Sequence, residues 1–144
     1  MKINQETSPL NILLADDDID DRIFFEKALK EIPLATTLSM VHNGEQLMEY
    51  LAVHADSLPD ILFLDLSMPR KTGFECLAEI KENEKLKALT VIMFTTSFTR
   101  GFDLEDNLKN TLLRMGATDY IRKPAEFEEL KRVIHQALIS VAAK

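Results

Sequence analysis

The chain has 144 residues, a formal net charge of -7 and a sequence pI near 5.0. This length suits one domain with a single filled core, and the negative charge disfavours direct binding to DNA or to an anionic membrane. No apolar run approaches the roughly 20 residues of a membrane span. Residues 1–9 are polar and lack the apolar segment of a signal peptide.

The chain contains one cysteine, Cys76, which excludes an internal disulfide and is typical of a reducing compartment. We see no internal repeat and no interior linker in the sequence. We therefore expect a cytoplasmic protein with a tail over residues 1–9 and one domain over residues 10–144.

Short apolar runs alternate with amphipathic segments from the start of this domain. Residues 10–15 predict a strand, and residues 37–41 predict a second, shorter one. Residues 20–31 predict a helix between them. The apolar residues expected on its inner side are Ile23, Phe24, Ala28 and Leu29. Asn43, with a glutamine three residues later, predicts the start of a helix over residues 44–54.

The most apolar run comes next and ends in a carboxylate. Residues 61–64 predict a strand buried on both faces, which is typical of a parallel sheet covered by helices. Asp65 follows at the carboxyl end of this strand, the edge at which open parallel sheets bind ligands. Thr72 and Glu75 form a capping box that predicts a helix over residues 73–83.

The last third of the chain predicts two further strands and two further helices. Residues 90–94 and 118–122 predict the strands. One helix, ended by Gly116, is indicated by the spacing of Leu104, Leu108, Leu112 and Met115. The final helix is indicated by Phe127, Leu130, Ile134, Leu138 and Val141.

Five strand–helix units in succession predict an α/β fold. Right-handed crossovers place helices on both faces of a five-stranded parallel sheet. We expect the flavodoxin-like, doubly wound strand order 2-1-3-4-5. The carboxyl ends of all five strands then meet at one edge.

Polar residues with phosphate and metal chemistry follow these strand ends. They are Asp16, Asp17, Asp18, Asp65, Thr95 and Lys123. Clustered carboxylates repel one another, and a bound divalent cation removes that repulsion. Oxygen ligands without a partnering histidine or cysteine suit Mg²⁺, with Mn²⁺ as the alternative. Thr95 can donate to a phosphoryl oxygen, Lys123 can supply positive charge, and Asp65 can accept the phosphoryl group as an aspartyl phosphate.

With these residues the chain resembles a two-component response regulator receiver domain of the standalone type, over about residues 10–142. Four motifs carry the resemblance in order and at near-family spacing: residues 13–18, residues 65–69 with Gly73, residues 95–97 and residues 120–124. The combination is specific, although each motif alone is weak.

The resemblance implies a role for each matching residue. Asp65 is the phosphoacceptor. Asp17 is a direct magnesium ligand, and Asp16 often acts through water. The main-chain carbonyl of Ser67 and a carboxylate oxygen of Asp65 complete the protein ligands. Thr95 is the switch hydroxyl.

Further roles follow from the same resemblance. Lys123 pairs with the phosphoryl group, and a cis peptide bond precedes Pro124. The ring of Tyr120 turns inward when the switch hydroxyl moves. Ser67 and Ser97 flank the path of the attacking water and influence the rate of dephosphorylation.

The resemblance also implies partners and an output. A sensor histidine kinase or a phosphotransfer protein donates the phosphoryl group. The face formed by the fourth helix, fifth strand and fifth helix then binds an unknown downstream protein or supports a homodimer. With no second domain before Lys144, we expect neither DNA binding nor membrane attachment. The protein catalyses only its own phosphorylation and dephosphorylation and is not otherwise an enzyme.

Three alternatives stay open. The chain could act as a phosphorelay intermediate. It could be an aspartate-nucleophile, Mg²⁺-dependent phosphohydrolase, although such enzymes carry their nucleophile after the first strand. It could also be a flavin-binding electron carrier, although carboxylates stand where that class needs phosphate-binding groups. Residues 98–110 hold about six more residues than the receiver pattern requires and could form a longer helix or a lip over the site.

Overall fold

The computed structural model describes residues 9–96 and 102–142, with the backbone alone for residues 102–106. The strands are β1 (Leu10–Ala15), β2 (Thr36–Val41), β3 (Ile61–Leu64), β4 (Val91–Thr95) and β5 (Asp119–Arg122). The helices are α1 (Ile19–Glu31), α2 (Gly44–Val53), α3 (Gly73–Glu82), α4 (Phe102–Arg114) and α5 (Phe127–Ala142). Every predicted strand and helix is present, and where both ends were predicted they agree with the structure or differ by one residue.

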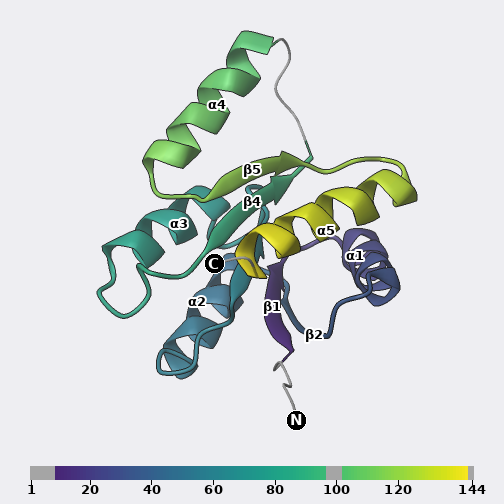
Figure 1. The fold of residues 1–144 in the computed structure, drawn as a ribbon. Helices are drawn as coiled ribbons and strands as arrows, with labels where there is room; N and C mark the ends of the chain where they lie inside the picture. Colours follow the sequence, from purple (N-terminus) through teal and green to yellow (C-terminus); the bar gives the residue numbers. More distant parts are fainter. Residues whose placement is uncertain (1–8, 97–101, 143–144) are drawn as a thin grey trace.

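All the strands pair in parallel, in the order β2-β1-β3-β4-β5 (Figure 1). The predicted flavodoxin-like order is therefore confirmed. Every residue of β3 and β4 is buried, as expected for strands that are covered on both faces. The carboxyl ends of β1, β3, β4 and β5 lie at the same edge of the sheet because all these strands run the same way.

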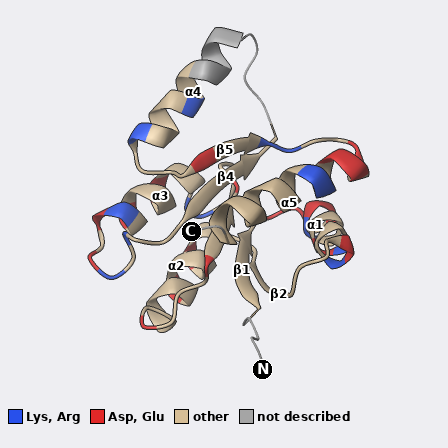
Figure 2. Ribbon diagram, viewed as in Figure 1, with Lys and Arg blue, Asp and Glu red and all other residues tan. Residues whose placement is uncertain are grey.

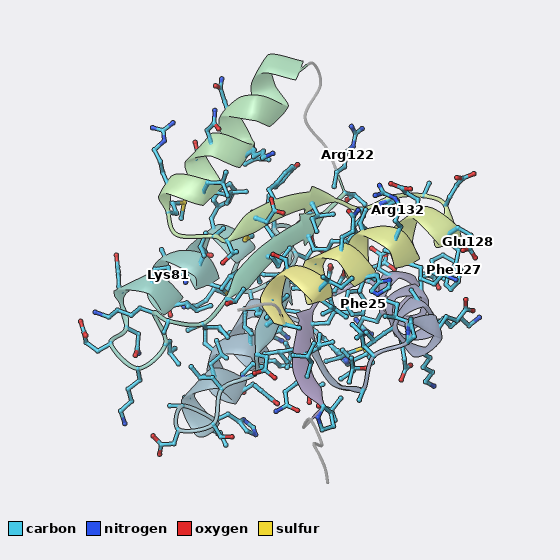
Figure 3. All side chains as sticks on the ribbon, viewed as in Figure 1. Phe25, Lys81, Arg122, Phe127, Glu128 and Arg132 are labelled. Carbon is cyan, nitrogen blue, oxygen red and sulfur yellow. The ribbon has the colours of Figure 1, made fainter. Side chains whose placement is uncertain are left out.

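The helices form a layer on each face of the sheet (Figure 1). One apolar cluster joins the sheet to α1 and α5, and the other joins it to α2, α3 and α4. Phe25 of α1 lies between that helix and the sheet, with its ring centroid 5.0 Å from Phe63 and 5.8 Å from Phe94 (Figure 3). These edge-to-face contacts fix α1 against the middle strands.

The inner side of α1 differs from the prediction. Ala28 and Leu29 are buried as expected, but Ile23 and Phe24 are 44% and 50% exposed. Phe25 is buried in their place. Because three apolar residues stand in a row here, helical periodicity alone did not determine which one faces the sheet.

Local capping signals were more reliable guides. The side chain of Asn43 accepts a hydrogen bond from the backbone N–H of Gln46 at the start of α2. Thr72 and Glu75 form the predicted reciprocal capping box at the start of α3. A cap satisfies backbone groups within one turn, so its sequence signal does not depend on distant parts of the fold.

The end of α4 is set by Gly116, which has a φ of 113°. The backbone N–H of Ala117 donates to Leu112, and the N–H of Gly116 donates to Leu113. This pair of bonds is a Schellman motif, which needs a left-handed residue that glycine adopts without strain. Of the segment 98–110, residues 102–110 are helical, and residues 98–101 lie outside the described residues.

Charged residues lie mainly on the helices and connecting loops (Figure 2). Lys131 of α5 bridges to Glu31 at the end of α1, at 3.0 Å, which links the two helices of one layer. Within the described part of the chain, no helix has the length and apolar character needed to cross a membrane.

Candidate functional site

Four of the predicted site residues meet at the carboxyl edge of the sheet. Asp16 follows β1, Asp65 follows β3, Thr95 ends β4 and Lys123 follows β5. Asp16, Asp65 and Thr95 are the buried polar residues of the described chain, and the Lys123 side chain is only 7% exposed. The sheet therefore concentrates ionisable groups at a place where water cannot screen them well.

The pleat of the sheet determines on which face each of these side chains lies. Side chains alternate between the two faces of a strand. By this alternation Asp16, Asp65 and Lys123 belong to the face covered by α1 and α5, on which Leu14, Phe63 and Ile121 also lie. Thr95 belongs to the opposite face, with Met93. The ammonium of Lys123 therefore lies on the same face of the sheet as Asp65, whereas the hydroxyl of Thr95 reaches Asp65 from the opposite face.

Asp65 is held by bonds to its carboxylate and its backbone. The hydroxyl of Thr95 donates to Asp65 Oδ1 at 2.7 Å, and the backbone N–H of Ser67 lies 3.3 Å from the same oxygen. The backbone N–H of Asp65 donates to Ala15 at 3.0 Å. Gly73 packs so closely that a Cβ there would lie 2.3 Å from the Asp65 carbonyl oxygen. The start of α3 thus approaches the acceptor backbone as only glycine permits.

The ammonium group of Lys123 is surrounded by carboxylates. Its Nζ lies 2.5 Å from Asp16 Oδ2, 2.8 Å from Asp21 Oδ2 and 3.5 Å from Asp65 Oδ2. Its position is further fixed by a backbone bond from Lys123 to the carbonyl of Thr95 at 2.9 Å. The first two contacts are hydrogen bonds, whereas the distance to Asp65 is longer than a good hydrogen bond.

These neighbours shift the pKa values of both charged partners. Burial raises the pKa of Asp16 to about 6, against the lowering effect of Lys123. Burial alone would lower the pKa of Lys123, but attraction to Asp65 and Asp16 outweighs it and the net pKa is raised. Lys123 therefore stays protonated at neutral pH and provides a permanent positive charge at the site.

The three carboxylates fit a small divalent cation. Asp16, Asp17 and Asp65 each offer an oxygen, and these atoms lie within 4.8 Å of one another. Asp17 is exposed, so this side of the cluster opens to solvent. An oxygen donor set that leaves room for water suits Mg²⁺ or Mn²⁺. Asp18 has a different role, because its side chain caps α1 by accepting a hydrogen bond from the backbone N–H of Asp21.

The other predicted residues are placed as follows. Ser67 is exposed just beyond Asp65. Tyr120 lies in β5 opposite Met93, half-buried against the apolar cluster beneath α2, α3 and α4. Ser97 lies outside the described residues. The functional roles assigned to these residues stay predictions.

The expected cis peptide bond before Pro124 is wrong for this structure, because the described residues contain no cis peptide bond. The trans form is intrinsically favoured by roughly 0.5–1 kcal/mol even before proline. With the trans bond Lys123 still reaches Asp16 and Asp21.

Sequence reasoning missed two contacts to the site from α1. Asp21 binds the ammonium of Lys123, and the guanidinium of Arg22 donates to the backbone carbonyl of Asp16 at 2.8 Å. Both residues lie in the first turn of α1, where acids are common for reasons of helix stability alone. The position of Asp21 in the sequence therefore gave no sign of a partner 102 residues away.

Fold and site together define a class of protein: a parallel α/β domain with a charged cluster at the carboxyl edge of its sheet. The chain belongs to the response regulator receiver domain family, whose family model matches residues 12–135. Receiver domains accept phosphoryl groups from histidine kinases or phosphotransfer proteins and act in signalling rather than as ordinary enzymes.

A curated relative of similar length is the probable methanogenesis regulatory protein FilR2 of Methanothrix harundinacea. It is 31% identical over 131 residues, which cover 89% of this chain and 81% of FilR2. Two other curated relatives are longer, and the chain spans 16% of one of them and 56% of the other. What those longer proteins do as a whole does not transfer directly to this chain.

Two similar solved structures have titles that bear on the site. The phosphorylated cyanobacterial phytochrome response regulator RcpA has a TM-score of 0.77 and 28% identity, covering 90% of this chain and 91% of its own. The Mn²⁺-bound form of response regulator Rcp1 has a TM-score of 0.74 and 29% identity, covering 89% of this chain and 91% of its own. The first is phosphorylated and the second binds a divalent metal.

Proposed function

We propose that this chain is a single-domain response regulator that takes a phosphoryl group from a histidine kinase or phosphotransfer protein onto Asp65. The observation that carries the proposal is the convergence of Thr95 and Lys123 on Asp65. Thr95 already donates to one oxygen of Asp65, and the Lys123 ammonium lies 3.5 Å from the other. A buried carboxylate between a hydroxyl and a cation is suited to carry a transferred phosphoryl group.

Each residue around Asp65 has its own role in the proposed phosphoryl transfer. A carboxylate oxygen of Asp65 attacks the phosphorus of a phosphohistidine, so that a P–O bond forms and the P–N bond breaks. Lys123 offsets the negative charge spread over the phosphoryl oxygens, and Thr95 donates a hydrogen bond to one of them. The backbone N–H of Ser67, beside Asp65, supports the orientation of the acceptor carboxylate.

A divalent metal fits beside Asp65, and we infer that it is Mg²⁺, held by Asp16, Asp17, Asp65 and the Ser67 carbonyl. When bound, it supplies positive charge next to the transferred group. Both oxygens of Asp16 already have partners within the protein, namely the Asp18 backbone and Lys123. This arrangement is consistent with a role for Asp16 through water, while exposed Asp17 offers the more accessible ligand.

The output we propose is a change in the face formed by α4, β5 and α5. A phosphoryl group adds roughly two negative charges at a buried edge. Thr95 and Lys123 are the groups that would move toward it, and they end β4 and follow β5. Tyr120, half-buried in β5, is the aromatic residue placed to follow this movement. A downstream protein or a second copy of the chain would bind the altered face.

The remaining expectations belong to the same proposal. Residues 10–144 would form the receiver domain, and residues 1–9 a tail. The buried, unpaired thiol of Cys76 is consistent with a cytoplasmic location.

The test is intact-mass measurement of the wild type and Asp65→Asn after incubation with acetyl phosphate and Mg²⁺. We expect the wild type to gain one phosphoryl group and Asp65→Asn to gain none. An equal gain in both proteins would count against Asp65 as the acceptor. Continuous release of phosphate from monoester substrates would favour the phosphohydrolase, and stoichiometric binding of FMN would favour the electron carrier.

A further inference from the structure

The contact between Asp21 and Lys123 is outside the predicted site. Asp21 lies in the first turn of α1, and its Oδ2 is 2.8 Å from Lys123 Nζ. Its backbone N–H is fixed by the side chain of the capping residue Asp18 at 3.0 Å. The carboxylate therefore extends from a rigid point, and its side chain is 33% exposed where that of Lys123 is only 7% exposed.

The geometry shows where the ammonium is held. Asp16 and Asp21 are both within hydrogen-bond distance of Lys123, whereas Asp65 is 3.5 Å away. Both close carboxylates therefore draw the ammonium away from the acceptor. A phosphoryl group on Asp65 would need the same ammonium, so it has to compete with them.

Asp16 and Asp21, the two carboxylates that compete for Lys123, would differ in their response to a bound metal. Asp16 belongs to the group of oxygens that fits a metal, and a cation there would compete with Lys123 for it. Asp21 does not belong to that group, so a metal there would not compete with Lys123 for it. A cavity of about 30 Å³ beside the pair, lined in part by Asp21 and Lys123, leaves room for the side chains to adjust.

We propose that Asp21 is a positioning residue that holds the Lys123 ammonium away from Asp65 and thereby lowers the affinity of the site for a phosphoryl group. The proposal rests on the proposed function for its consequence, whereas the contact between Asp21 and Lys123 is a feature of the fold itself. A purely structural role is the alternative: acids in a first turn stabilise a helix through its dipole. Asp20 is the matched control, because it lies in the same turn, is exposed and is not among the carboxylates that contact Lys123.

The first measurement is the affinity for beryllofluoride, a phosphoryl mimic, at a fixed Mg²⁺ concentration, followed by ¹⁹F NMR. We expect Asp21→Asn to bind it about fivefold tighter than Asp20→Asn does, because one competitor for the ammonium is gone. Comparison with Asp20→Asn removes the general effect of one lost negative charge. Asp21→Ser, which also lacks the carboxylate and suits a first turn, serves as a second variant. Equal or weaker binding by both Asp21 variants would overturn the proposal.

The second measurement needs neither metal nor mimic. In metal-free protein the ¹⁵N and ¹H signals of the Lys123 ammonium report its hydrogen-bond partners. We expect these signals to shift in Asp21→Asn and to stay near the wild-type position in Asp20→Asn; unchanged signals in both would overturn the restraint. If the wild type binds no beryllofluoride while the ammonium signals shift as expected, the proposed function fails and the positioning of Lys123 by Asp21 stands.

Discussion

Two lysines, Lys123 at the carboxyl edge of the sheet and the half-buried Lys81 of α3, show how differently this fold can satisfy an ammonium group. Lys123 lies among the carboxylates of Asp16, Asp21 and Asp65, and its pKa is raised. Lys81, in the last turn of α3 (Figure 3), donates to the backbone carbonyls of Lys87 and Leu89 at 3.0 and 2.8 Å. Burial lowers the pKa of Lys81, because no carboxylate opposes the loss of water there.

The difference separates the candidate site from a contact that only holds the fold together. Lys81 links α3 to the loop that follows it by donating hydrogen bonds to uncharged backbone carbonyls. This contact does not depend on any other charged group. At the carboxyl edge, the charges depend on each other, so removing one leaves the others unbalanced. A buried ionic cluster of this kind is weak evidence for a gain in stability, because the cost of removing its charges from water can exceed their attraction. Three experiments test this contrast, from the largest expected effect to the smallest.

Lys123→Met should have the largest effect. In EDTA at pH 7 we expect the free energy of unfolding to fall by about 4 kcal/mol, because buried carboxylates lose their cation. Adding Mg²⁺ should stabilise this variant more than the wild type, since the cation replaces the lost charge. Urea denaturation with and without Mg²⁺ measures both effects. Asp17→Asn in the same background should reduce the rescue; full rescue there would place the metal elsewhere.

The raised pKa of Asp16 predicts a pH effect of intermediate size in metal-free protein. The folded pKa of about 6 lies above the ordinary value of 3.8, so the group contributes stability that is complete below about pH 4. That contribution is lost as the pH rises through 6. Relative to Asp16→Asn, the wild type should lose about 2 kcal/mol of unfolding free energy between pH 4 and 7. Urea denaturation at four pH values in EDTA measures it, and parallel curves for the two proteins would contradict the prediction.

Lys81→Met should have the smallest effect. It removes two hydrogen bonds to backbone carbonyls but preserves most of the aliphatic chain that packs near Gly116. We expect a loss of about 1 kcal/mol in the free energy of unfolding. The loss should not depend on Mg²⁺, which the same denaturation series can check. A Mg²⁺-dependent loss would mean that the two regions are coupled.

The features that the sequence alone determined are those with short-range causes. The apolar run Ile61–Leu64 is the strand buried on both faces that its composition predicted, and the side chains of Asn43 and Thr72 cap their helices as predicted. The alternation of strands and helices predicted a parallel sheet, for which the flavodoxin-like order was the expected choice for five strands. Because parallel strands end at one edge, the predicted sheet placed Asp65 and Lys123 at the same edge, and the family resemblance implied that Lys123 pairs with the phosphoryl group.

The tertiary structure decided what depends on how elements pack against each other. Whether Phe24 or Phe25 faces the sheet depends on the rotation of α1 about its axis, which contacts with Phe63 and Phe94 determine. The pairing of Asp21 with Lys123 likewise needs α1 placed against the end of β5. Periodicity and capping act within a few residues, whereas such contacts arise only when the whole sheet and its helix layers are assembled.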